Sequence, residues 1–192
     1  FYILLFTCAV VRAVHLELVR SLNLEDFMMA FRRFVSRRGM PSVLWSDNAK
    51  VFIAGSEKLP QTFGPLAPKW KFIVPRSPWW GGWWERLVRS VKSGLKKTLK
   101  QRCLTCTELE TLLHEVEACI NSRPLTFVGD NIEDRRPLTP ANFIVGQSNL
   151  FTPQRLDGEE ASVNADQLRE RLEVKNTLLE QFWRVWTKEY LR

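Results

Sequence analysis

The chain has 192 residues, of which 45% are hydrophobic and 26% charged, enough for one packed core and an appendage. Its longest apolar run, Phe1 to Val11, is too short to cross a bilayer, which takes roughly 20 residues, and no basic segment precedes it as in a secretory signal. Four cysteines are too few for the disulfide framework of a secreted domain. We therefore exclude membrane-spanning, secreted and disordered classes.

Positive charge is concentrated in the middle of the chain. The net charge is +7, and the segment from Arg76 to Arg102 has eight Lys or Arg residues against one acid, Glu85. From Asp157 to the end, eight acids accompany six bases. Because the excess is local, the sequence predicts a polyanion-binding site in the middle of the chain.

The first part of the chain predicts strands around a helix. Strands are expected at Tyr2–Thr7 and at Ala13–Val19, where apolar residues alternate with others. Asn23 is expected to cap a helix with an apolar stripe, which ends at Gly39. A short apolar strand follows at Ser42–Ser46.

The second part predicts longer helices. A strand at Trp70–Val74 leads, through a loop rich in Pro and Gly, into a helix at Glu85–Lys100. Thr105 begins a capping box for a helix that runs to about Asn121. Three regions are expected: a core over 1–128, an extended connector over 129–162, and a C-terminal helix over 163–192 with an apolar docking stripe.

Two acids are candidates for metal binding. Asp47 follows the Ser42–Ser46 strand, where open α/β sheets bind ligands, and Glu85 begins a helix 38 positions later. Paired carboxylates can hold two Mg²⁺ or Mn²⁺ ions that activate a nucleophile in phosphoryl transfer. The structural alternative is a turn Asp and a Glu that complements the helix dipole, and spacing alone favours that alternative.

The helix that begins at Glu85 has a basic face. At 100° per residue, Arg89, Lys92 and Lys96 lie within about 40° of Glu85, while most apolar residues lie on the opposite side. A basic face around one acid predicts contact with a phosphate backbone. The alternative is a solvated helix face with weak ion pairs.

Four tryptophans, Trp79, Trp80, Trp83 and Trp84, lie before and at the start of this helix. They are candidates for stacking on unpaired bases. Packing of the helix start explains Trp84 equally well, and the two interpretations remain open for the others. His15 is interpreted as a hydrogen-bonded strand histidine.

Seven segments occur in an order and spacing that resemble one protein family. They are Tyr2–Cys8, Arg12–Val19, Phe31–Gly39, Trp45–Asn48, Pro78–Lys92, Asn121–Thr126 and Pro137–Pro140. Together they resemble the integrase of Pao/BEL-type long-terminal-repeat retrotransposons, over about residues 1–150. Gln181–Leu191 also resembles the helix that follows the integrase core in these polyproteins.

The resemblance implies a ribonuclease H-like α/β core in which an Asp, Asp, Glu triad binds two Mg²⁺ ions. Asp47 matches the second acid and Glu85 the third. Arg89 and Lys92 match positions that face the DNA of element ends, and we add Lys96 of the same face and Asn48, beside Asp47, as DNA-contacting candidates.

The chain also departs from the family pattern. The strand with the first Asp, the zinc-binding domain expected upstream and the β-barrel expected downstream are absent from this sequence, so we expect a truncated core. The usual Ser-Asp-Asn-Gly-Thr reads Ser-Asp-Asn-Ala49-Lys50 here, which places a side chain and a charge beside the site and is typical of a decayed copy.

The predicted function is DNA integration: metal-dependent 3′ processing and strand transfer that join element DNA ends to target DNA. This chain by itself is expected to be inactive, because the first Asp is absent. The full protein is expected to form a homo-oligomer and to act in the nucleus after import from the cytoplasm. The alternative is a non-catalytic DNA-binding or assembly protein derived from a retroelement.

Overall fold

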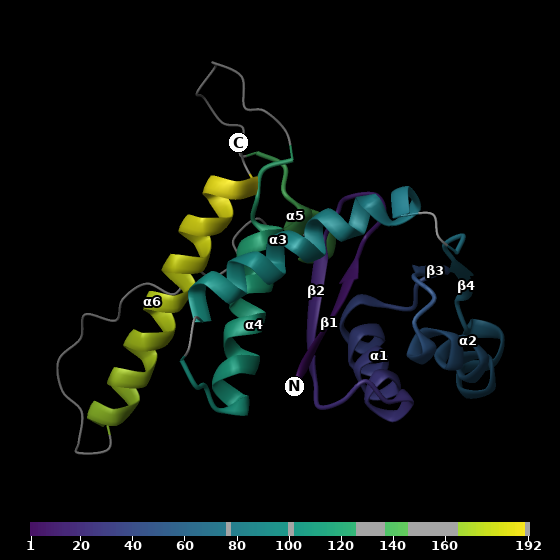
Figure 1. Cartoon of the computed structure of the whole chain (residues 1–192), viewed down its shortest axis with the longest axis horizontal. Helices are drawn as coiled ribbons and strands as arrows, with labels where there is room; N and C mark the ends of the chain where they lie inside the picture. Colours follow the sequence, from purple (N-terminus) through teal and green to yellow (C-terminus); the bar gives the residue numbers. More distant parts are fainter. Residues whose placement is uncertain (76–77, 100–101, 126–136, 146–164, 191–192) are drawn as a thin grey trace. The chain divides into compact units, whose positions relative to one another are not determined.

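The computed structural model describes residues 1–75, 78–99, 102–125, 137–145 and 165–190. The fold is mixed α/β, rich in helices and with two small sheets (Figure 1). The chain forms two compact units: unit 1 comprises Phe1–Phe6 and His15–Val88, and unit 2 comprises Thr7–Val14 and Arg89–Arg192. The predicted division at 128 and 162 stays a prediction.

The strands of both sheets confirm the predicted strands with small shifts at their ends. In the first sheet β1 (Tyr2–Thr7) pairs with β2 (Val14–Val19). In the second, β3 (Val43–Ser46) pairs in parallel with β4 (Lys69–Phe72). Parallel pairing places the carboxyl ends of β3 and β4 at the same edge of the sheet.

Helix α1 (Leu24–Arg38) has the predicted caps and apolar stripe. Asn23 Oδ1 accepts a hydrogen bond from the Asp26 backbone N–H at 2.7 Å, which satisfies one free donor of the first turn. Gly39 ends the helix with φ 84°, which favours glycine. The stripe buries Phe27 and Phe31 in the core of unit 1.

Helix α2 (Lys50–Phe63) was not predicted. It has no side-chain cap and no acid in its first turn, and it contains Pro60. Packing holds it in place: Leu59 is buried with the α1 aromatic rings, and a Cβ on Gly55 would lie 2.7 Å from Phe27 Cε1. Tertiary contacts with α1 thus override weak local helix signals.

An ionic cluster around the buried Glu17 joins β2 to α1. Glu17 is 2% exposed; its Oε2 accepts a hydrogen bond from Arg33 Nε at 2.6 Å, and its Oε1 accepts one from Arg37. His15 Nε2 lies 2.9 Å from Glu17 Oε1, and Arg38 Nε donates to His15 Nδ1. His15 therefore has hydrogen-bond partners in the fold, as predicted.

Acid is expected to weaken unit 1 through Glu17. Burial alone raises the pKa of Glu17, but hydrogen bonds from His15 and Arg33 and the charges of Arg37 and Arg33 outweigh it and lower the pKa to about 2. Because the folded pKa is depressed, this stabilisation is present above about pH 4.5 and is lost as pH falls toward 2. Glu17→Gln should cost roughly 3 kcal/mol at neutral pH.

The check is the free energy of urea unfolding of both proteins at neutral pH and at two acidic pH values. The difference between wild type and Glu17→Gln should shrink as pH falls through this window. A difference that stays constant would contradict the assignment of this pH dependence to Glu17.

Unit 2 is helical and is held together by α4 (Cys106–Asn121) and α6 (Ala165–Tyr190) (Figure 1). The predicted capping box at Thr105 and Glu108 is present. Helix α5 (Pro140–Val145) packs on α4 and lies inside the predicted connector; residues 129–136 and 146–162 of that connector lie outside the described residues.

The Asn121–Arg123 motif fastens the end of α4 to Val14, the first residue of β2, and to Arg12 before it. The Asn121 side chain pairs with both backbone groups of Val14: its Oδ1 accepts from the N–H and its Nδ2 donates to the carbonyl, each at 2.8 Å. Arg123 donates to the Arg12 carbonyl at 2.7 Å. These motif residues therefore have a structural role in unit 2.

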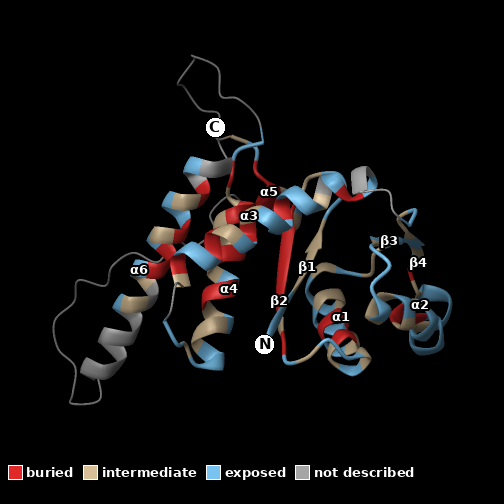
Figure 2. Cartoon of the chain, in the orientation of Figure 1, coloured by how far each residue is buried: buried red, intermediate tan, exposed pale blue. Residues whose placement is uncertain are grey.

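Helix α6 packs on the second half of α3 (Gly82–Leu99) through a glycine. A Cβ on Gly94 would lie 2.6 Å from Cε2 of Phe182, which is fully buried and stacks on Trp186. Most described members of the predicted docking stripe are thus buried within the chain (Figure 2), although Trp183 is 38% exposed. In the described segments, no helix combines the length and apolar character needed to cross a membrane.

Candidate metal and nucleic-acid site

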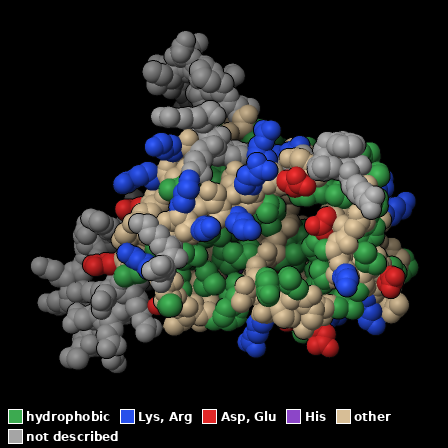
Figure 3. Space-filling view, in the orientation of Figure 1, with side chains coloured by type: hydrophobic (Ala, Val, Ile, Leu, Met, Phe, Trp, Pro, Cys, Tyr) green, Lys and Arg blue, Asp and Glu red, His purple; other side chains and the backbone are tan. Residues whose placement is uncertain are grey.

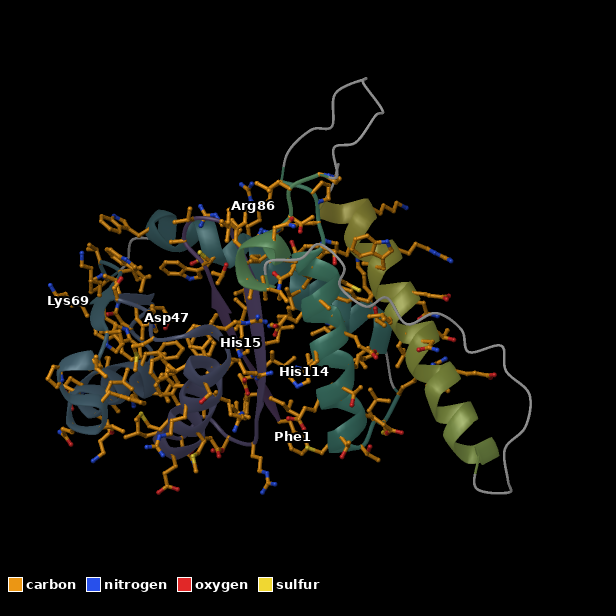
Figure 4. The ribbon with its side chains drawn as sticks, turned by 180° about the vertical axis from the view of Figure 1, so that it is seen from behind. Phe1, His15, Asp47, Lys69, Arg86 and His114 are labelled. Atoms are coloured by element: carbon orange, nitrogen blue, oxygen red, sulfur yellow. The ribbon has the colours of Figure 1, made fainter. Side chains whose placement is uncertain are left out.

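Asp47 lies at the carboxyl end of β3 and its side chain is exposed (Figure 4). Its Oδ1 accepts a hydrogen bond from the Ala49 N–H at 3.0 Å, which orients the carboxylate. Asn48 Nδ2 donates to the Ile73 carbonyl at 3.0 Å and so joins the ends of β3 and β4. Asn48 therefore supports the strand ends that carry Asp47, and its contact with DNA stays a prediction.

Glu85 lies in the first turn of α3 and is exposed. Its carboxylate folds back over Gly81: a Cβ at that position would lie 2.6 Å from Glu85 Oε1 and 3.2 Å from Trp84 Cζ2. The absence of a side chain at Gly81 therefore leaves room for the carboxylate. Helix α3 begins one turn before the predicted start, which places the partial positive charge of its N-terminus beside this acid.

Asp47 and Glu85 both belong to unit 1. Hard carboxylate oxygens suit Mg²⁺ or Mn²⁺, and neither side chain is buried away from solvent. Within the part of the chain that the structure describes, no three His, Cys, Asp or Glu side chains converge as a metal site. A metal ion held by this pair would need further ligands from water, DNA phosphates or other residues.

The residues after Asn48 have an ordinary backbone conformation. Ala49 has φ −62°, which any L-residue adopts, so a glycine is not required there. Lys50 is exposed at the start of α2, where a cation opposes the helix dipole. Lys50 therefore places a positive charge three positions after Asp47, and the turn between them needs no glycine.

The basic face of α3 has the predicted arrangement. Arg89, Lys92 and Lys96 are all exposed, and Figure 3 shows blue Lys and Arg side chains along the surface formed by this helix. The opposite side is apolar, and its buried residues are Leu87, Val91 and Leu95. Val88 is 39% exposed, because it lies at the edge of that stripe.

Sequence reasoning missed two residues near Asp47. Trp45 is exposed on β3, and Lys71 Nζ of β4 lies 5.2 Å from the centre of its ring. Trp80 lies beside Trp45. The only sequence signal was alternation, with exposed positions at every second residue of both short strands. The side chains of Trp79 and Trp83 lie outside the described residues.

No protein-family model and no curated protein matches this chain. A chain in the cryo-EM structure of the simian T-cell lymphotropic virus intasome in complex with PP2A regulatory subunit B56 gamma has a similar fold, with a TM-score of 0.55 at 14% sequence identity. The similarity covers 82% of this chain and 53% of that chain, so this chain spans about half the length of its neighbour. At this identity the likeness concerns the fold alone.

Proposed function

We propose that this chain is a ribonuclease H-like integrase core of the Pao/BEL type, which acts on DNA through divalent metal ions. One observation carries the proposal: Asp47 directly follows β3 and Glu85 lies in the first turn of α3, both in unit 1. The basic residues follow further along the same helix. The fold likeness to a chain in a retroviral intasome structure supports it.

In the proposed reaction, Asp47 and Glu85 bind and orient the metal ions. When bound there, Mg²⁺ or Mn²⁺ would activate the attacking oxygen and stabilise the leaving oxygen of a phosphodiester. Gly81 leaves room for the Glu85 carboxylate, and the Ala49 N–H orients that of Asp47. The resemblance implies a third acid, and we propose that it completes the site together with Asp47 and Glu85.

The basic face of α3 contacts the DNA backbone in this proposal. Arg89, Lys92 and Lys96 recur at intervals of three and four residues, so they form one row along the helix. Phosphate contacts position DNA and carry little sequence information. The proposed partners are element-end and target DNA, bound by a homo-oligomer of the full protein.

The salt dependence of duplex binding tests this face. Replacing Arg89, Lys92 and Lys96 with Ala should flatten the slope of log affinity against log salt by up to about three units, because each lost phosphate contact removes about 0.9. Binding should weaken alike for unrelated sequences. Fluorescence anisotropy of a labelled duplex at several salt concentrations measures both quantities.

A matched triple variant separates a site from bulk charge. Lys58, Arg184 and Lys188 are also exposed but lie on other helices, and their replacement with Ala removes the same charge. This control should change the salt slope far less. Equal slopes for the two triple variants would show that the α3 face is only a solvated surface.

A further inference from the structure

One solvent-exposed face of the β3–β4 pair has Trp45, Lys69 and Lys71, and a second tryptophan from outside the strands lies against it. The parallel register places Val43 beside Lys69 and Trp45 beside Lys71. Trp80, in the 3₁₀ helix η2 (Pro78–Gly81), lies against Trp45 with ring centroids 6.1 Å apart and planes at 32°. We call Trp45, Trp80, Lys69 and Lys71 the tryptophan face.

The core of unit 1 does not use these two indoles. Trp70, on the opposite side of β4, lies in the aromatic core against Phe27, and its Nε1 donates to Ser46 Oγ at 2.9 Å. Trp45 and Trp80 are instead 38% and 46% exposed. Two large exposed aromatic side chains that touch each other form a patch typical of a binding surface.

We propose that the tryptophan face stacks an unpaired base of a single DNA strand, with the neighbouring phosphate at Lys71. Every base has a π-face, so indoles stack on single strands with little sequence preference. Lys71 Nζ lies over the Trp45 ring, 5.2 Å from its centre. A base can replace the ammonium there, since stacking stabilises more than an exposed cation–π contact, and Lys71 is then available to the phosphate.

Charge favours a nucleic acid over a protein segment on this face. Neither β3 nor β4 contains an acid, and Lys69 and Lys71 are both exposed. Asp47 comes two positions after Trp45, immediately beyond the end of β3. The inference rests on the proposed action on DNA, and it would place an unpaired base close to the candidate metal site, where a strand is to be cut or joined.

The test compares three fluorescent probes without metal, in EDTA: a dT oligonucleotide, an abasic oligonucleotide of the same length and phosphate count, and a duplex. Wild type should bind dT more tightly than the abasic probe. Trp80→Ala and Trp45→Leu should each weaken dT binding by roughly 5- to 150-fold, the value of one stacked base, and leave the abasic and duplex affinities within about twofold. Lys71→Ala should weaken both single strands and reduce their salt slope by about 0.7.

Two controls distinguish loss of base stacking from general effects of removing a tryptophan or of unfolding. Trp183→Ala removes a tryptophan of α6 with the same exposure as Trp45 and should change none of the affinities. Thermal unfolding shows whether a variant is folded, and Trp80, outside the strands, gives a second variant if Trp45→Leu is unstable. Equal affinity for dT and abasic strands, or dT affinity unchanged in both tryptophan variants, would overturn the inference.

The same probes separate this inference from the proposed function. EDTA removes divalent ions, so failure of the metal site leaves the stacking measurement intact. Trp80→Ala could bind single strands as wild type does but lose self-association. That result would assign the face to a protein partner and contradict the inference. The α3 triple variant could lose duplex binding while wild type binds dT no more tightly than the abasic strand. That result would support the proposed function and contradict this inference.

Discussion

Replacing Glu85 with Gln is expected to reduce DNA strand transfer at least about 100-fold. The assay uses this chain joined to an upstream strand with the first acid, an element-end duplex and Mn²⁺. Gln keeps the shape of Glu but removes the negative charge that binds the ion. Mutation of a residue that only hydrogen-bonds to a metal ligand already lowers metal affinity or activity by about 10–100-fold, so loss of a ligand itself should cost at least as much. Asp47→Asn should have the same effect. Glu57→Gln removes another exposed carboxylate, on α2, and should stay within about twofold of wild type.

A pair of glycine variants tests the position of the carboxylate rather than its charge. A Cβ on Gly81 would lie 2.6 Å from Glu85 Oε1, so Gly81→Ala should displace the carboxylate, and the flexible side chain can move at little cost to stability. Gly82 has nothing within 4 Å of its Cβ position and is the matched control. Strand transfer should fall in Gly81→Ala and not in Gly82→Ala.

Two results would contradict this account of Glu85. Full activity of Glu85→Gln in the joined protein would leave the non-catalytic DNA-binding alternative as the better interpretation. Robust Mn²⁺-dependent strand transfer by the present chain alone, lost in Glu85→Gln, would show that the chain supplies its remaining acid from elsewhere.

Phe182→Ala is expected to cause the largest loss of stability, about 3–5 kcal/mol, because this fully buried ring fills the space between α6 and Gly94 of α3. Gly94→Ala should also destabilise, by roughly 1–3 kcal/mol, since its Cβ would overlap the ring by approaching to 2.6 Å. Free energies of urea unfolding measure both effects.

The double variant provides the control for this contact. Once Phe182 is Ala, a methyl group on Gly94 enters the cavity and also favours the helix, so Gly94→Ala should become neutral or stabilising. Additive losses in the double variant would contradict direct packing of Gly94 on the Phe182 ring.

Local sequence signals correctly predicted the helices whose ends have capping residues or a terminating glycine. The Asn23 cap, the Gly39 stop and the Thr105 capping box were all correct, because each depends on residues within a few positions of one another. Helix α2 lacks such signals and forms through Gly55 and Leu59 against α1, contacts that depend on the fold.

The candidate site also has features that local sequence predicted and features that depend on the fold. Periodicity predicted the exposed row of Arg89, Lys92 and Lys96, because helix geometry is local. The approach of Lys71 to the Trp45 ring depends on the register of two strands about 25 positions apart, which no spacing in the sequence reveals. That Asp47 and Glu85 bind one metal site remains the central proposal.

Anomalous diffraction from crystals of the joined protein, grown with Mn²⁺ and DNA, tests that proposal most directly. We predict an anomalous peak at the carboxyl end of β3 with oxygens of both Asp47 and Glu85 at about 2.1 Å from bound Mn²⁺. A map in which Mn²⁺ binds neither acid, or in which the two carboxylates lie more than about 10 Å apart beside DNA, would contradict it.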